Sequence, residues 1–238
     1  MEDAFDPPMT RMAIAAAFWI LLHVVMAGSP LRWAIAGRIG ENAFRALFSV
    51  LSFIGIVGLA IAYRHATSAE SFYGMRLVEP WMMWTPPVLM VPAVIFFVGS
   101  LSQPNPTMVM GERHLADADP ARGVFRITRH PMLWSFLLWA FGHFVANGDL
   151  ASALLFGSIM IVAAAGMGSI DRKQARRDPE GWRRFASMTS VVPFLAILAG
   201  KNRLVMSEIG WSRIGLAAAL YVAIVAVHRL VFGVPAIP

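Results

Sequence analysis

The sequence predicts an all-α fold, a polytopic membrane helix bundle with about six transmembrane helices plus a short interfacial or re-entrant segment. Two observations predict it. Of the 238 residues, 58% are hydrophobic and 14% are charged, whereas soluble domains are nearer a quarter charged. The apolar residues also form runs of about 20, the length that a helix needs to cross a bilayer. Such runs are too long and continuous for the strands of a membrane barrel.

Each expected helix is a long apolar run with a recognisable boundary. Pro131 is favoured at a first helical position and so opens the fourth helix. A tight turn at 147–149 makes the fifth helix antiparallel and adjacent to the fourth. Three prolines, Pro86, Pro87 and Pro92, should kink or break the third. Residues 187–199 are apolar but too short to span, so we read them as interfacial or re-entrant. The expected helices cover residues 12–28, 43–63, 81–102, 131–146, 150–170 and 209–232.

The distribution of charge predicts the topology. Six spans put both termini on one side, and the loops on the other side hold most of the 20 lysines and arginines. The positive-inside bias places those loops in the cytoplasm of a cell inner membrane, with both termini periplasmic. The net charge of +6 is therefore expected from loops and predicts no nucleic-acid binding. The chain has no cysteine, which excludes thiolate haem ligation, iron–sulfur clusters and cysteine zinc sites.

The topology sorts the six histidines. His23 and His130 fall on the cytoplasmic side of the bilayer, whereas His143 and His228 fall toward the other side and are expected to pack between helices. His130 and His143 would be roughly 20 Å apart along a helix and cannot share a metal. His23 lies in an apolar run, where an ionisable residue is costly and needs a partner. It is either a neutral histidine bonded to a neighbouring helix or a metal ligand with His130, which requires helices one and four to be neighbours.

The segment before the fourth helix predicts an anion site. A residue before proline avoids the helical region, so His130 caps the helix from outside. The free amides of the first turn, together with Arg126 and Arg129, suit a haem propionate, the carboxylate of S-adenosylmethionine or a lipid phosphate. Asp171 is expected to end the fifth helix on the same side. It is either a solvated helix end or a carboxylate facing one of these arginines.

Several motifs together resemble the NnrU family of bacterial membrane proteins, which includes zeta-carotene isomerases. The resemblance covers about residues 12–200, and 201–238 add a C-terminal transmembrane helix to what is expected to be a single membrane domain, 1–238. It implies haem b, ligated by histidines that match His23 and His130. It also implies redox-dependent isomerisation of a cis double bond in a polyene, or a link with denitrification in bacteria. The matching stretches are Leu22-His23, Pro30 to Arg32, Arg45 to Ser49, Gly123 to Trp134, Trp139, Gly142-His143, Ala146 to Asp149 and Gly168 to Lys173.

The same Arg-His-Pro block is more distantly similar to isoprenylcysteine carboxyl methyltransferases, which bind S-adenosylmethionine at this helix mouth. Two departures weaken that likeness. The tyrosine usual two residues after the proline is Leu133 here. The usual pair of glutamates appears only as Asp171 followed by Arg172.

The residues and the resemblance together leave three hypotheses open. The first is a haem b protein with His23 and His130 on the iron, acting as a cis–trans isomerase or binding nitric oxide in nitrite and nitric oxide respiration. The second is an S-adenosylmethionine-dependent membrane methyltransferase. The third is a non-enzymatic accessory factor for respiratory enzymes. The expected partners are membrane lipid and a small hydrophobic substrate or nitric oxide, and the protein partners are not predicted.

Overall fold

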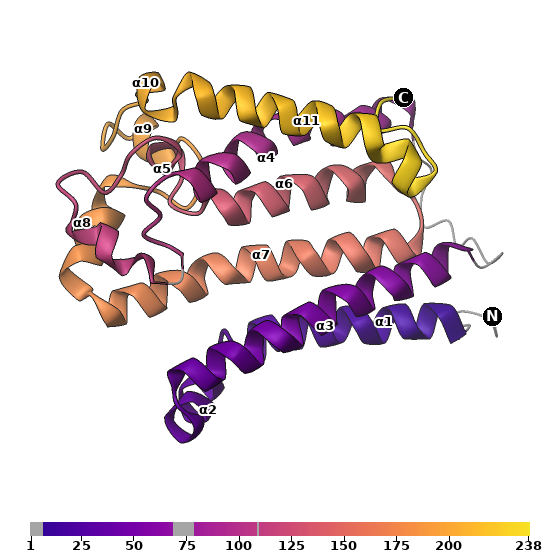
Figure 1. Ribbon diagram of the computed structural model, residues 1–238, viewed down its shortest axis with the longest axis horizontal. Coiled ribbons are helices and arrows are strands. Elements are labelled where there is room, and N and C mark those ends of the chain that lie inside the picture. Colours follow the sequence, from indigo (N-terminus) through magenta and orange to yellow (C-terminus); the bar gives the residue numbers. More distant parts are fainter. Residues whose placement is uncertain (1–6, 69–78, 109) are drawn as a thin grey trace. The chain divides into compact units, whose positions relative to one another are not determined.

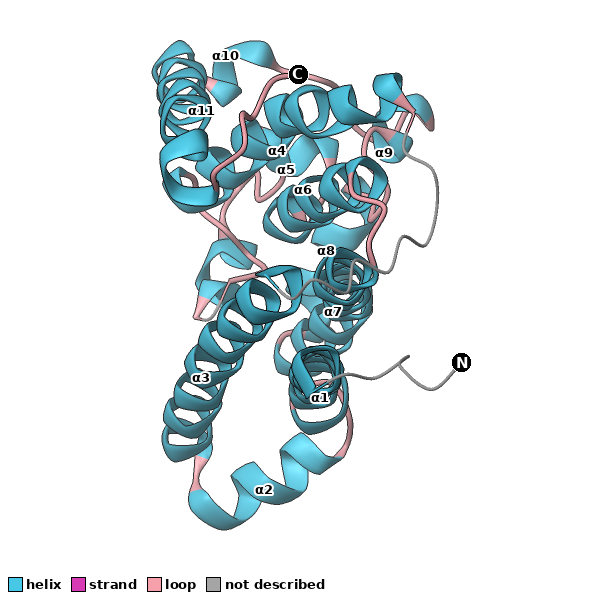
Figure 2. Cartoon of the chain, turned by 90° about the vertical axis from the view of Figure 1, so that its right-hand side faces the viewer, coloured by secondary structure: helices cyan, strands magenta, loops and turns pink. Residues whose placement is uncertain are grey.

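A computed structural model describes residues 7–68, 79–108 and 110–238, and these ranges contain helices and no β-strand (Figures 1 and 2). Five helical spans in them are long and apolar enough to cross a membrane, and Pro131–Ala146 is a shorter apolar helix. The predicted polytopic helix bundle is thereby confirmed. The five spans are Pro7–Met26, Glu41–Thr67, Pro80–Ser102, Leu150–Arg177 and Trp211–Phe232.

The chain divides into two compact units. Unit 1 comprises 1–85 and 140–166, and unit 2 comprises 86–139 and 167–238. The division passes through helices α6 (Pro131–Ala146) and α7 (Leu150–Arg177), each of which contributes one part to each unit.

Unit 1 is built on α1 (Pro7–Ile20) packed along the antiparallel α3 (Glu41–Ser68) (Figure 1). Their contact buries an apolar cluster in which Met12 and Leu59 are fully enclosed. The π-helical turn η1 (Leu21–Met26) continues α1, and α2 (Leu31–Ile39) closes the turn to α3 (Figure 2). Residues 21–26 were expected to be helical as part of the first helix, but their π-helical form and the helix α2 were not expected from the sequence.

The remainder of unit 1 comes from the adjoining parts of α6 and α7. His143 of α6 stacks on Phe156 of α7, with ring centroids 5.0 Å apart. The hydroxyl of Tyr63 in α3 lies 2.9 Å from the Ser152 hydroxyl of α7. These contacts confirm that the fourth and fifth expected helices are neighbours, and they give His143 the packing role expected of it.

Unit 2 begins with α4 (Thr85–Ser102), which follows the 3₁₀ turn η2 (Pro80–Trp84). Pro86 and Pro87 fall in the first turn of α4, where the missing N–H groups would have no helical partner. Pro92 lies inside the helix, which continues through it to Ser102. The prolines therefore do not break this helix.

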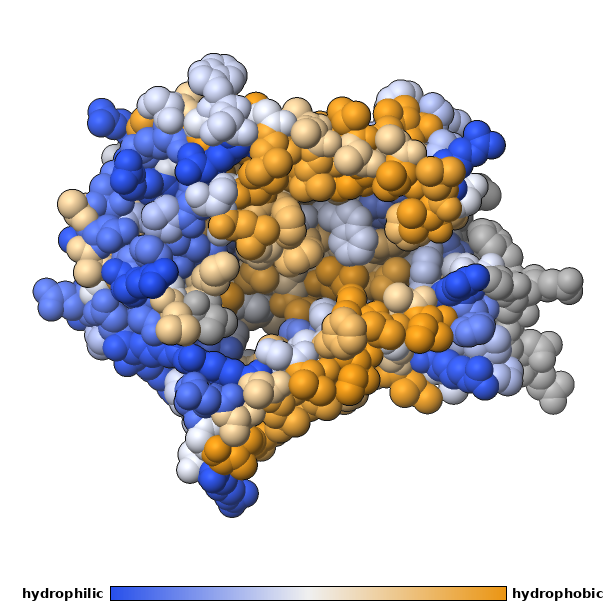
Figure 3. Space-filling view, in the orientation of Figure 1, coloured by the Kyte–Doolittle hydropathy of each residue, from blue (hydrophilic) through white to orange (hydrophobic). Residues whose placement is uncertain are grey.

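A buried cluster around Phe125 and Phe185 forms the core of unit 2, and α11 (Trp211–Phe232) packs on α4 through a second cluster that contains Ala217. Hydrophobic residues cover α11 in Figure 3, whereas hydrophilic residues gather over α8 and the loops of the same unit. The shorter helices of unit 2 are η3 (Gly111–Ala116), α5 (Val124–Ile127), α8 (Pro179–Met188), α9 (Leu195–Leu198) and α10 (Met206–Ile209).

One sequence-based boundary needs correction. Helix α7 does not end at Asp171 but continues to Arg177, because the basic residues that follow Asp171 form a further helical stretch rather than a loop. The segment 187–199, expected to be interfacial or re-entrant, finishes α8, continues without helix and then makes the single turn α9. The exposed apolar side chains of Val192, Phe194 and Leu198 favour an interfacial position for it.

Candidate functional site

His130 lies immediately before Pro131, outside α6, as the proline rule predicts. Its carbonyl accepts the first helical hydrogen bond from the Trp134 N–H at 3.0 Å, so it is the N-cap residue. Its side chain is fully buried. The ring is thus held in the interior of unit 2 at the start of an apolar helix.

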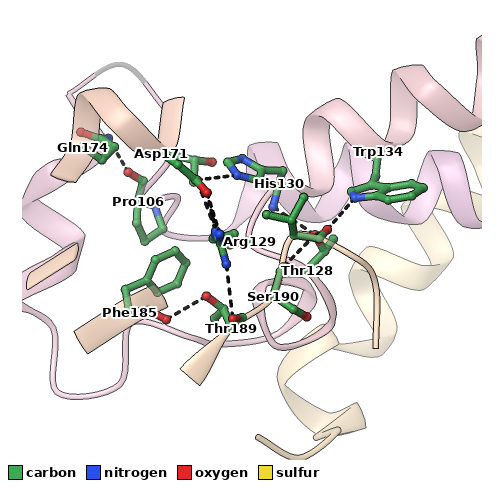
Figure 4. A network of polar contacts seen from close by, with 12 residues as sticks. Pro106, Thr128, Arg129, His130, Trp134, Asp171, Gln174, Phe185, Thr189 and Ser190 are labelled. Carbon is green, nitrogen blue, oxygen red and sulfur yellow. Dashed lines mark hydrogen bonds and ion pairs between the residues drawn. The ribbon is translucent and has the colours of Figure 1, made fainter. Parts of the chain in front are cut away.

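The loop that carries His130 is fixed by a segment from much later in the chain. The Arg129 N–H donates to the Ser190 carbonyl at 2.9 Å. The Thr128 hydroxyl and the Trp134 indole N–H both donate to the Val191 carbonyl, each at 2.7 Å (Figure 4). Backbone carbonyls of the extended stretch after α8 therefore set the position of the His130 ring.

Asp171 joins His130 to Arg129, as Figure 4 shows. Its Oδ1 lies 2.7 Å from His130 Nε2, and its Oδ2 accepts from Arg129 Nη2 at 2.6 Å. Arg129 Nε donates to the same carboxylate at 3.1 Å. Because the helix continues past Asp171, this carboxylate projects from the body of α7 and not from a frayed end. The expectation that Asp171 faces one of the two arginines is met by Arg129.

The hydrogen bonds of His130 determine which nitrogen is available to a ligand. A carboxylate paired with an arginine is ionised and accepts, so His130 Nε2 carries the proton. The other nitrogen, Nδ1, is buried and has no hydrogen-bond partner among the described residues. With the proton on Nε2, the lone pair of the imidazole lies at Nδ1, and the carboxylate of Asp171 lies behind the ring. Metal-binding histidines commonly have such a carboxylate on the second nitrogen.

Arg126, the other arginine expected at this helix mouth, belongs to a separate ion-pair cluster. Its Nε donates to Glu208 at 2.6 Å, its Nη1 donates to Asn202 at 2.8 Å, and its Nη2 contacts Asp119. The hydrogen bond from Arg126 lowers the pKa of the Glu208 carboxyl, and the same bond raises the pKa of Arg126. Glu208 also accepts from the Gly123 N–H at 2.9 Å. The cluster ties α10 to α5 and so to the segment before α6.

His23 lies in unit 1, on the π-helical turn η1. The Ala27 N–H bonds the Leu22 carbonyl at 3.1 Å, five residues back, as in a π-helix. Such turns occur frequently at functional sites. His23 Nδ1 lies 2.9 Å from the Trp19 carbonyl oxygen, which can only accept, so Nδ1 carries the proton. Nε2 is left with a lone pair and has no hydrogen bond from the described residues.

Aromatic rings surround His23. The Trp19 ring lies 4.0 Å from its centroid, and the Phe48 ring meets it edge-on at 5.2 Å. Phe48 in turn stacks parallel to Phe44 at 6.4 Å. A ring in an apolar, aromatic setting with one nitrogen fixed to a backbone carbonyl could hold haem iron through the other nitrogen.

Unit 2 thus brings together three of the five predicted site residues, His130, Arg129 and Asp171. It also contains Arg126, with other partners, whereas His23 belongs to unit 1. Each histidine taken by itself could serve as a ligand of haem b, because it is buried or half-buried and has one nitrogen held and the other without a partner among the described residues. No group of three or more His, Cys, Asp or Glu in the described part of the chain could hold a metal by itself.

Sequence reasoning missed Glu208, Asp119 and Asn202 as partners of Arg126, since two of them lie far along the chain and none belongs to a motif. It also missed the Trp19 carbonyl as the partner of His23. His228, expected to pack, donates from Nδ1 to the Val234 carbonyl at 2.9 Å and lies against Phe232.

Comparison with known proteins gives matches of two kinds. The sequence model of the NnrU protein family matches residues 11–236. The chloroplastic 15-cis-zeta-carotene isomerase of Arabidopsis thaliana is 24% identical over 202 residues, which are 82% of this chain and 52% of that protein. The Zea mays enzyme of the same name is 29% identical over 82 residues, 34% of this chain and 22% of that protein. The chain spans about half the length of the Arabidopsis relative. No solved structure matches the chain significantly.

Proposed function

The chain belongs to the NnrU protein family, and on that premise we propose that it is a membrane isomerase that binds haem b and acts on the cis double bond of a polyene. The proposal has His23 and His130 as the two iron ligands. One observation carries it. His23 is fixed by the Trp19 carbonyl on a π-helical turn, with the lone pair of Nε2 left unused. The name of the two plant relatives, 15-cis-zeta-carotene isomerase, supports the reaction class.

When bound, haem supplies redox and Lewis-acid chemistry. The residues of this chain orient the ligands. The Trp19 carbonyl selects the tautomer of His23 that has its lone pair on Nε2. Asp171 keeps the proton on Nε2 of His130 and raises the basicity of Nδ1. Arg129 balances the charge of Asp171, so that the carboxylate remains ionised in a half-buried position.

The two histidines differ in how easily they can leave a metal. Releasing His23 exposes an imidazole with only a backbone carbonyl as a partner. Releasing His130 leaves a ring that remains bonded to Asp171 at 2.7 Å. We therefore infer that His130, whose ring would stay bonded to Asp171, would be the histidine that gives up its place on the group to a hydrophobic substrate from the bilayer.

The absorption spectrum of the detergent-purified protein tests the proposal. The wild type is expected to show a Soret band, and a pyridine haemochrome assay should identify haem b. His23→Ala and His130→Ala should each abolish or shift the band, whereas His65→Ala, at an exposed position of α3, should leave it unchanged. A wild-type protein without a Soret band, even after haem is added, contradicts the proposal. The reaction is tested by incubating the protein with a 15-cis carotene and measuring the trans isomer by chromatography.

Two alternatives have distinct signatures in the same preparation. A spectral change on adding nitric oxide, without any isomerase activity, would favour the role in nitrite and nitric oxide respiration. Saturable binding of S-adenosylmethionine, lost in Arg129→Ala, would favour a methyltransferase. Arg129 already donates to Asp171 through Nε and Nη2, which gives the methyltransferase no additional support.

We also propose that the protein lies in the cell inner membrane with both termini periplasmic. The 238 residues contain no cysteine, so a single introduced cysteine reports its own side. Arg203→Cys and Val234→Cys both lie at exposed positions. In intact cells, a membrane-impermeant maleimide is expected to label the cysteine at 234 and not the one at 203. The opposite pattern would invert the topology.

A further inference from the structure

Arg32 is a buried cation, and one N–H group of its guanidinium has no acceptor among the described residues. It lies in the first turn of α2, and its side chain is 6% exposed. Its Nη2 donates to Glu41 Oε1 at 2.5 Å. Its Nη1 is buried and has no hydrogen-bond partner among the described residues. A buried guanidinium is costly unless its donors are paired, so an unpaired one calls for an acceptor.

The neighbourhood of Arg32 carries an excess of positive charge. Glu41 is shared, because its Oε1 also accepts from Arg45 Nε at 3.0 Å. Two guanidinium groups thus meet one carboxylate. Arg32 also lies between the candidate membrane spans Pro7–Met26 and Glu41–Thr67. An anionic group can pair with it at this boundary without entering the hydrocarbon.

A continuous series of ring contacts connects Arg32 to His23 within unit 1. The guanidinium carbon lies 5.2 Å from the centroid of Phe44 and 4.4 Å from that of Trp33. Phe44 stacks on Phe48, whose ring meets His23. On the other side of His23, the Trp19 indole N–H is also buried without a partner among the described residues. The surroundings of His23 therefore combine flat apolar rings with N–H donors that lack acceptors.

The other two arginines proposed for an anion site differ in this respect. The guanidinium nitrogens of Arg126 donate to Glu208, Asn202 and Asp119, and Arg129 donates to Asp171 and the Thr189 carbonyl. A ligand carboxylate at either would have to compete with acceptors of the chain itself. At Arg32, one nitrogen needs an acceptor that the chain does not provide.

We propose that Arg32 anchors a carboxylate of a flat, amphiphilic ligand whose apolar face lies on Phe44 and Phe48 and whose metal is bound by His23. For haem b this carboxylate is a propionate, so the inference rests on the proposed function. It moves the recognition of the acidic group from the mouth of α6 to the turn between α1 and α3. It also explains why an arginine, whose planar fork matches a carboxylate, is stacked between two rings here.

Haem titration of the purified protein tests the inference, with absorbance as the readout and no activity required. Arg32→Met keeps the stem of the side chain and leaves Glu41 paired with Arg45. It should weaken the affinity for haem b by about tenfold or more, as expected for the loss of a charge-assisted hydrogen bond. Arg45→Met, which contacts the same carboxylate, is the matched control and should retain the wild-type affinity. Arg32→Lys should lie between the two.

Haem dimethyl ester has no free carboxylate. It therefore shows whether Arg32→Met weakens haem binding through loss of the carboxylate contact or through damage to the fold. The wild type and Arg32→Met should bind the ester with equal affinity. An Arg32→Met protein that binds haem b as tightly as the wild type overturns the inference and leaves the proposed function intact. A wild type that binds neither porphyrin overturns both. Loss of a co-purifying anionic phospholipid in Arg32→Met, with haem binding unchanged, would assign Arg32 to a lipid phosphate and also overturn the inference.

Discussion

The two histidines proposed as ligands are held in opposite ways. His23 is oriented by a carbonyl of its own helix and by aromatic rings, with no side-chain hydrogen-bond partner among the described residues. His130 is oriented by a carboxylate that comes from another helix and is itself paired with an arginine. The first arrangement depends on helix geometry and packing, and the second depends on charge. Substitutions that alter charge should therefore affect unit 2 far more than unit 1.

The same contrast holds beyond the histidines. The described part of unit 1 has an apolar core along α1 and α3, with ion pairs at the turn between them. Unit 2 places two multi-membered ion-pair clusters, around Asp171 and around Arg126, next to its core. Ionic contacts of this kind respond to pH, whereas apolar packing does not. A change of pH should therefore affect the stability of unit 2 more than that of unit 1, as charge-altering substitutions should.

Asp171→Ala should produce the largest effect. It leaves the guanidinium of Arg129 and the buried ring of His130 without their shared acceptor. Removing one partner of a buried ion pair costs about 3–5 kcal/mol, and the partial exposure of Asp171 places the loss near the lower figure. Thermal unfolding in detergent measures it. The control is Asp117→Ala, whose carboxylate is 46% exposed and lies 3.5 Å from the ring of His114. An equal loss in both variants would contradict the assigned role.

Leu59→Ala should produce the next largest effect, and in the other unit. Leu59 is fully buried between α1 and α3, so truncation leaves a cavity and costs about 2–4 kcal/mol. Since no charge is involved, the loss in unfolding free energy should be the same at pH 5 and pH 8. Ile61→Ala, at a 54% exposed position of the same helix, is the control. A loss of unfolding free energy that changes with pH would contradict the view that unit 1 is held by apolar packing.

The contrast also shows which features a sequence can reveal. Pro131 predicted the start of α6 and the position of His130 outside it, because a proline restricts its own neighbours and the rule is local. The apolar runs predicted the spans for the same reason. The π-turn at His23 had no such signal, since the residues of η1 are an apolar run like the rest of the first helix.

Long-range pairing was the other feature that the sequence did not show. Arg126 and Arg129 were both expected at an anion site, but only Arg129 meets Asp171. Arg126 finds its partner in Glu208, 82 positions later. Which of two neighbouring arginines faces a given carboxylate depends on the path of the chain in between. The continuation of α7 past Asp171 was also not predicted, because the basic residues after Asp171 were interpreted as the flank of a loop.

Acid should weaken unit 2 through Glu208. Its pKa is lowered in the folded state by the hydrogen bond from Arg126, so its contribution to stability is complete above its ordinary pKa of 4.5. That contribution is lost as the pH falls through the lower, folded pKa. Glu208→Gln removes the charge and should cost about 1–2 kcal/mol at neutral pH. The difference between wild type and variant should shrink toward zero in unfolding measurements taken at successively lower pH. A difference that is constant with pH would mean that the carboxylate is not ionised in the folded protein.

Gly55→Ala should produce the smallest effect, but it acts nearest to His23. An added Cβ would lie 3.2 Å from both the Phe18 and the Trp19 rings, and Trp19 supports His23 through its ring and its carbonyl. We expect a loss of about 1 kcal/mol from overpacking. Gly58→Ala lies on the same helix, where an added Cβ meets nothing within 4 Å, so it should be neutral or slightly stabilising through helix propensity. If the two alanines shift the unfolding temperature alike, the close packing of α3 on the ring of Trp19 does not hold His23 in place.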